Sequence, residues 1–72
     1  MINTPDVDIR QRIEQLLVND KRTKDAVIDV AYLAGQVTLT GQVAKSDQKA
    51  AAEELARSVA GVLSVNNELR VR

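Results

Sequence analysis

The chain has 72 residues, which is enough for one domain near the lower size limit for folding without disulfides or metals. It contains no cysteine and no histidine, so disulfides are excluded, a zinc site is disfavoured, and stability must come from its many aliphatic residues. Ten basic residues balance ten acidic ones, which argues against nucleic-acid binding because such proteins usually carry a basic excess.

The residues given predict neither a membrane-spanning helix nor a signal peptide. No stretch approaches the roughly 18 apolar residues of a membrane helix, and the N-terminal residues MINTPD lack the pattern of a signal peptide. We expect the chain to be cytoplasmic if complete as written, and periplasmic or membrane-associated if it is a domain excised from a longer parent. The strand-like residues run up to Arg72 without a tail, which favours the excised domain.

Residues 5–18 are expected to form the first helix. Thr4 can cap its N-terminus, and Pro5 suits the first helical position. Apolar side chains then recur at helical spacing and define the face toward the core. They are Ile9, Ile13, Leu16 and Leu17.

Residues 26–33 and 36–43 are expected to form a hairpin of two strands. The first segment is rich in β-branched residues, and the second alternates polar and apolar residues. A type I′ turn requires positive φ at both central positions, which suits alanine poorly. We therefore expect a type I turn at Ala34-Gly35, with Gly35 in the left-handed region and a small bulge.

Residues 46–60 are expected to form the second helix, capped by Ser46 and ended by Gly61. Its stripe of core residues is Ala52, Leu55, Ala56 and Val59. Residues 63–71 alternate as a third strand. Its inward positions are Leu63, Val65, Asn67, Leu69 and Val71.

The element order α-β-β-α-β predicts an α+β domain over residues 1–72, a two-layer sandwich with two helices on one face of a three-stranded sheet. The helix between the second and third strands sets those strands parallel, so the sheet is expected to be mixed. The sequence leaves open which strand the third one joins, but a central second strand is favoured.

Several segments, in this order and spacing, resemble the BON domain (bacterial osmotic-shock and nodulation family). They are Ile28-Asp29-Val30, the run GQVTLTGQV at 35–43, and the pattern Ala52, Leu55-Ala56, Val59-Ala60-Gly61-Val62, Val65-Asn66-Asn67 and Leu69. The resemblance covers Asp8 to Val71; it departs at Ala34, where the family often has Asn or Asp, and at Ala60. It implies a non-catalytic module of bacterial envelope, stress or transport-associated proteins that binds phospholipid or protein partners.

No catalytic or cofactor site is expected. Histidine and cysteine are absent, and Ser46, Ser58 and Ser64 lack a base partner. The glycines match neither GxGxxG nor a P-loop, so we expect structural roles for them. Gly35 turns the hairpin, Gly61 ends a helix, and Gly41 marks either a bulge or the close passage of another backbone such as a helix.

Asn67 falls on the apolar face of the third strand, where its amide must find hydrogen-bond partners. The favoured interpretation is structural: the amide ties down a loop near a helix end. A ligand contact is the alternative.

Two binding surfaces are proposed from the sequence. The first contacts anionic phospholipid through basic residues, namely Lys21, Arg22, Lys24, Arg10 and Arg12. Interspersed acidic residues and the lack of an aromatic anchor favour an ordinary solvated surface there. The second serves protein interaction, with an envelope protein partner or in oligomerisation, through the outer sheet face or an edge strand. The residues of this face are Val27, Ala31, Leu33, Thr38 and Thr40.

The same element order occurs in RNA-binding KH domains, but the chain has no GxxG loop, and Tyr32 is its only aromatic residue. Nucleic-acid binding is therefore not favoured. The isolated domain is expected to be a monomer.

Overall fold

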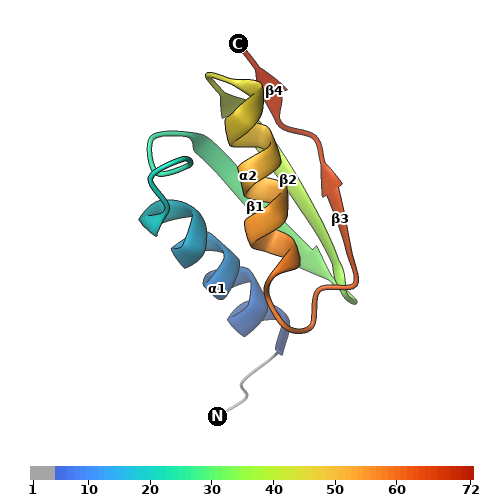
Figure 1. The fold of residues 1–72 in the computed structure, drawn as a ribbon. Helices are drawn as coiled ribbons and strands as arrows, with labels where there is room; N and C mark the ends of the chain where they lie inside the picture. The colour runs from blue at the N-terminus through green and yellow to red at the C-terminus, as the bar shows by residue number, and fades with distance from the viewer. Residues whose placement is uncertain (1–4) are drawn as a thin grey trace.

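The computed structural model describes residues 5–72, with side chains from Asp8 onward. Two helices pack on one face of a mixed sheet, and the predicted α+β fold is confirmed (Figure 1). In chain order the elements are α1 (Pro5–Asn19), β1 (Val27–Leu33), β2 (Gln36–Val43), α2 (Ser46–Arg57), β3 (Ser64–Asn67) and β4 (Arg70–Val71). The expected cap at Thr4 lies outside the described residues.

Strand β2 lies at the centre of the sheet, as the sequence favoured. It pairs antiparallel with β1, from Val27 opposite Gln42 to Leu33 opposite Gln36. On its other side it pairs in parallel first with β3 and then with β4. The predicted third strand is thus observed as two shorter strands, β3 and β4, which both pair with β2 and are separated by residues 68–69.

The interruption has a side-chain cause. The backbone N–H of Leu69 donates to Oδ1 of Asn67 at 3.2 Å instead of continuing the ladder, while the N–H of Glu68 still donates to the Leu39 carbonyl at 2.8 Å. The side chain of Leu69 nevertheless enters the core, where it is almost fully buried. The kink therefore preserves the inward packing of the predicted strand.

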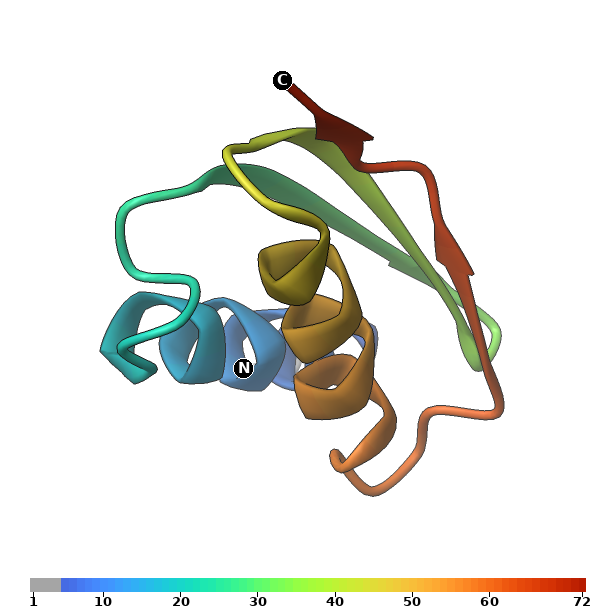
Figure 2. The ribbon, with the colours of Figure 1, turned by 45° about the horizontal axis from the view of Figure 1, so that its top comes forward.

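The core lies between the sheet and the two helices, and both helices lie on the same side of the sheet (Figure 2). Small side chains on α2 let this helix approach the sheet closely. The buried cluster consists of Ile13, Leu17, Val30, Val37, Leu39, Val43, Ala52, Ala56, Val59 and Leu69.

Three apolar residues expected in the core lie outside it. Val71 is 45% exposed, because the two-residue strand β4 at the C-terminal end of the chain extends beyond the cover of α2. Leu16 is 37% exposed at the margin of the face that α1 buries. Leu63 is 83% exposed because the chain has not yet entered β3 there: its N–H donates to the Gly35 carbonyl at 2.7 Å. Its side chain lies over Gly35, where a Cβ would come within 2.6 Å of the leucine Cδ1.

Both ends of α2 differ from the expectation. The N-cap is Lys45 rather than Ser46, and Oε1 of Gln48 accepts the N–H groups of Ala44 and Lys45 at 2.7 and 3.1 Å. The helix ends at Arg57 rather than at residue 60, because Ser58 begins a turn and its hydroxyl donates to the Leu55 carbonyl at 2.6 Å.

Gly61 therefore does not end the helix directly but lies in the turn that follows it. Its φ is +98°, and a Cβ there would come within 2.6 Å of Cδ1 of Ile9. Its carbonyl accepts the hydroxyl of Tyr32 at 2.8 Å. This glycine lets the turn pack closely against α1 and β1.

The hairpin turn also differs from the expectation. Leu33 pairs directly with Gln36, and both Ala34 (φ +50°) and Gly35 (φ +90°) have positive φ, as a type I′ turn requires. The expected bulge is absent from this hairpin, whose register is continuous. The right-handed twist of the strands favours this turn over a type I turn, at the cost of a strained alanine.

Gly41 lies against a strand rather than a helix. Its φ is +130°, and a Cβ would collide with the carbonyl oxygen of Val27 on β1. The close passage expected at this glycine is therefore made by the neighbouring strand of its own hairpin.

Replacing Ala34 by asparagine, which tolerates the left-handed region, is expected to stabilise the domain by about 1 kcal/mol. The measurement is the free energy of unfolding in urea. Ala60→Asn is the control, since Ala60 is an exposed turn residue without positive φ and should give no gain. An Ala34→Asn protein no more stable than the wild type would contradict the strained-turn interpretation.

Candidate functional site

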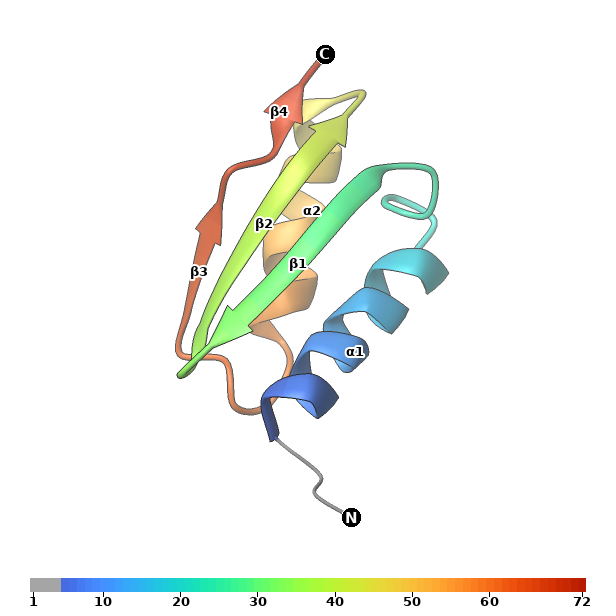
Figure 3. The same cartoon turned by 180° about the vertical axis from the view of Figure 1, so that it is seen from behind.

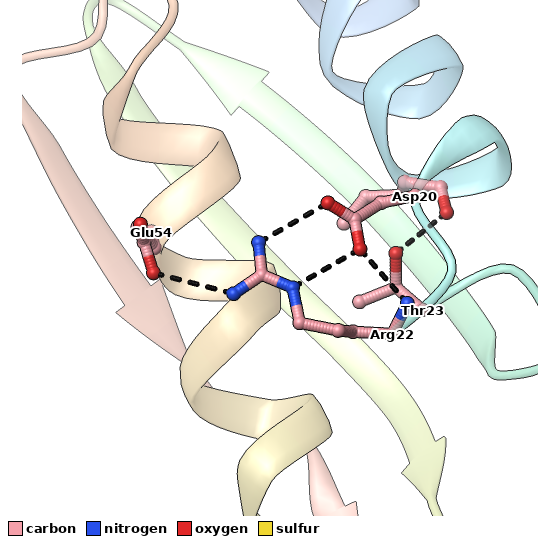
Figure 4. Close-up of polar contacts among 5 residues, drawn as sticks. Asp20, Arg22, Thr23 and Glu54 are labelled. Atoms are coloured by element: carbon pink, nitrogen blue, oxygen red, sulfur yellow. Dashed lines mark hydrogen bonds and ion pairs between the residues drawn. The ribbon is translucent and has the colours of Figure 1, made fainter.

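The loop between α1 and β1 is ordered by an ion pair within it. Oδ1 of Asp20 accepts the backbone N–H of Arg22 at 2.8 Å. The guanidinium of Arg22 in turn donates to both carboxylate oxygens of Asp20 at 3.1 Å, in the two-point geometry that makes such pairs specific. Its third nitrogen lies 3.6 Å from Oε2 of Glu54 on α2 (Figure 4). Arg22 therefore links this loop to α2.

Thr23 closes the C-terminal end of α1. Its side chain is buried, and its hydroxyl donates to the Leu17 carbonyl at 2.6 Å. The N–H groups of Thr23 and Lys24 both donate to the Asp20 carbonyl, at 3.1 and 2.9 Å. These bonds satisfy carbonyl groups that a helix end leaves free, and they hold the loop in a defined shape.

The same pairing shifts two pKa values. Hydrogen bonds from the side chain and then the backbone of Arg22 lower the pKa of Asp20, and the Asp20 carboxylate raises the pKa of Arg22. Because the folded pKa of Asp20 is depressed, its contribution to stability is present above the pKa of an unfolded aspartate. That contribution is lost as the pH falls through the lower, folded value.

The basic residues predicted to contact phospholipid differ in whether they have a carboxylate partner. Arg22 has two carboxylate partners. Lys21 and Lys24 are exposed, and among the side chains described from Asp8 to Arg72 no ion pair involves either lysine. Arg22 is exposed as well, so the two lysines differ from it in having no carboxylate partner among the described side chains.

The two arginines of α1 project from different sides of the helix, because positions two residues apart differ by about 200°. Arg10 precedes Glu14 by four residues and Val18 by eight, which places it on the flank toward β1. Arg12 precedes Leu16 by four residues, on the other flank. Arg10 is therefore the α1 arginine on the side of the cleft that Lys24 lines.

A cleft of about 250 Å³ opens between the C-terminal half of α1 and the start of β1. Its walls are mainly apolar, and Lys24 lies at its margin. Val18 in this wall is 65% exposed, an unusual position for valine on an amphipathic helix. The lining residues are Glu14, Leu17, Val18, Thr23, Lys24, Ala26 and Ile28.

The outer face of the sheet is uncovered within residues 5–72, and the residues proposed for protein contact lie there. Val27 and Leu33 are 66% and 74% exposed, and Ala31 is exposed between them. Thr38 lies opposite Ala31 in the β1–β2 register, and Thr40 follows on the same face. These residues form a mixed surface of small and apolar side chains.

Asn67 connects the sheet to α2. Its Nδ2 donates to the Lys49 carbonyl at 2.8 Å and lies 3.4 Å from Oε1 of Glu53. Its Oδ1 accepts the N–H of Leu69. The amide is half-buried, and both its N–H donor and its oxygen acceptor are used within the protein. Asn67 therefore connects the N-terminal half of α2 to the break between β3 and β4.

Among the described residues, no group of three or more potential ligands could hold a metal ion. Neither described helix combines the length and the apolar character needed to cross a bilayer.

The comparison with protein families finds a match to the BON domain over residues 5–72. The chain belongs to the BON family. BON domains are non-catalytic modules associated with membrane-binding and transport-associated proteins. In a comparison with curated proteins, none matches this chain.

Two features of this BON domain were missed in the sequence. The cleft depends on where α1 lies relative to β1, although Val18, an apolar residue off the helix stripe, was a visible signal. The bond from Arg22 to Glu54 joins residues 32 positions apart, and no local pattern marks it.

Replacing Asn67 by alanine is expected to destabilise the domain by about 1–3 kcal/mol, because the Lys49 carbonyl and the Leu69 N–H lose a partner in a half-buried site. Urea unfolding measures the effect. Asn66→Ala is the matched control, since Asn66 is exposed and bonds only to Glu68. Equal losses in the two variants would show that Asn67 makes no special connection.

The pKa of Asp20, followed by NMR through the amide of Arg22, is expected to lie below that of aspartate in an unfolded peptide. In Arg22→Gln the midpoint should rise toward the peptide value, because the charged hydrogen-bond donor is gone. An unchanged midpoint in this variant would show that Arg22 does not hold the carboxylate.

Proposed function

We propose that this BON domain tethers a bacterial envelope, stress or transport-associated parent protein to anionic phospholipid through the loop that carries Lys21 and Lys24. The supporting observation is that both lysines are exposed on a loop held by internal hydrogen bonds, and that Lys24 lines a cleft with the exposed Val18. Cations next to an exposed apolar residue suit the boundary between headgroups and acyl chains.

The strength of this contact follows from the number of available cations. Each basic residue near an anionic surface contributes about 1 kcal/mol. Because Arg22 is occupied by Asp20 and Glu54, and Arg12 lies on another flank, we assign the contact to Lys21, Lys24 and Arg10. Three cations give weak binding that salt screens, so the domain would act with further contacts of its parent.

The double variant Lys21→Gln/Lys24→Gln is expected to bind phosphatidylglycerol vesicles about 30-fold more weakly at low salt, the equivalent of about 2 kcal/mol. Vesicle co-sedimentation measures the partition coefficient. The control is Lys45→Gln/Lys49→Gln, which changes the net charge equally on α2 and should retain most of the binding.

Two results would contradict the proposal. One is an absence of wild-type binding to phosphatidylglycerol vesicles at low salt. The other is an equal loss in both double variants, which would indicate a response to net charge rather than a contact made by the loop.

A protein partner is the second candidate, and the exposed Val27 and Leu33 on the uncovered sheet face favour it. Chemical-shift mapping distinguishes the two: lipid would perturb residues 20–24 and α1, whereas a protein partner on the sheet would perturb β1 and β2.

A further inference from the structure

Strand β1 is an edge strand, and the direction of its free backbone groups can be derived. The carbonyls of Gly35, Leu39 and Val43 accept bonds from the β3–β4 side. Backbone N–H and carbonyl groups alternate in direction along a strand, so those of residues 36, 38, 40 and 42 point toward β1. The paired residues 27, 29, 31 and 33 direct their N–H and carbonyl groups toward β2. The N–H and carbonyl groups of Ile28, Val30 and Tyr32 therefore point away from the sheet.

These outward groups have no partner elsewhere in the part of the chain that the structure describes. No backbone bond outside the β1–β2 ladder involves residues 28, 30 or 32 there. Edge strands are commonly protected by lysine, proline or a bulge. β1 has none of these within Val27–Leu33, and its one charge, Asp29, lies on the outer face. The opposite edge of the sheet is interrupted at Glu68 and Leu69.

Helix α1 lies beyond the free edge of β1 rather than directly behind it. Figures 1 and 3 show this offset from opposite sides of the molecule. The cleft lined by Leu17, Val18, Ala26 and Ile28 is the space beside that edge. One more strand next to β1 would cover this space, and its inward side chains would contact the apolar flank of α1.

The offset also decides what can occupy the edge. If β1 paired antiparallel with β1 of a second copy of the chain, the two α1 helices would lie on the same face of the joined sheet. Both helices would then need the same space next to the two paired strands. An extended segment without a helix of its own avoids this conflict. Lys21 and Lys24 lie just before β1 together with Asp25, and Glu14 lines the cleft with Lys24. No ion pair among the described side chains occupies the two lysines, so both are available to the acidic end of a strand bound there.

We propose that β1 binds an extended peptide segment that adds antiparallel to it, places apolar side chains in the α1–β1 cleft, and ends in acidic residues near Lys24. Main-chain bonds from Ile28, Val30 and Tyr32 supply the pairing, and the cleft selects apolar residues at alternate positions. The antiparallel direction brings the C-terminal end of the segment to the lysines.

The test uses a synthetic peptide of alternating threonine and valine that ends in two aspartates, titrated into the ¹⁵N-labelled domain without lipid. We expect saturable shifts at the amides of Ile28, Val30 and Tyr32 and at residues around Val18. In antiparallel pairing, side chains that enter the cleft belong to residues whose N–H groups face β1. N-methylation of the valines should therefore weaken binding about tenfold or more, whereas N-methylation of the threonines should leave it unchanged.

Variants of the protein provide the second arm. Val18→Asp should weaken peptide binding about tenfold, because it puts a charge in the apolar cleft close to the acidic end of the peptide. Gln15→Asp adds the same charge to α1 on the side away from Leu17 and should have little effect. Both residues are exposed, so both variants should fold.

The remaining outcomes overturn the proposal. Equal affinity for the two methylated peptides would exclude pairing with the edge, and weaker binding only of the threonine-methylated peptide would indicate a parallel strand. Concentration-dependent shifts at the same amides without peptide would identify a second copy of the chain as the occupant. Because vesicles are absent, none of these results depends on phospholipid binding.

Discussion

The position of α1 relative to the edge of β1 is the constraint on which the surfaces of this domain depend. Two helices cover one face of a sheet whose central strand is β2 (Figures 1 and 2). The buried cluster lies where α2 packs against β2 and α1 packs against α2 and β1. Beside β1 the cover is incomplete, because α1 lies past the edge. Ile28 and Tyr32 consequently remain half-buried, Val18 remains exposed, and an apolar cleft separates helix from strand.

The loop that spans this gap explains why the cleft keeps its shape. Thr23 terminates α1, Asp20 holds Arg22, and Arg22 reaches Glu54 on the other helix. The ion pairs are solvent-exposed and individually weak, but together with the backbone bonds of the loop they fix where Lys21 and Lys24 stand. This non-catalytic module thus presents positioned charges next to an apolar surface.

Local patterns predicted most of the architecture. The helical spacing from Ile9 to Leu17 and the alternation through β2 led directly to the observed helix and strand, because each pattern has one period and one buried face. The central position of β2 was favoured but left open, since no local pattern says which strand the third one joins. The errors lie where a tertiary contact overrides the local pattern. Asn67 bonds to Leu69 and breaks the third strand, Leu63 lies on Gly35 instead of in the core, and strand twist imposes positive φ on Ala34. Val18, an apolar residue off the helix stripe, was the only local sign of the cleft, since the offset of a helix from a strand has no sequence period.

Native-state hydrogen exchange measured by NMR tests the free edge of β1 most directly. If α1 leaves this edge open, the amides of Asp29, Ala31 and Leu33 should be protected by their bonds to β2, while those of Ile28, Val30 and Tyr32 should exchange rapidly. Protection that alternates along the strand is the result this account predicts. Equal protection of all six amides in the monomeric domain would show that the edge is covered and would contradict it.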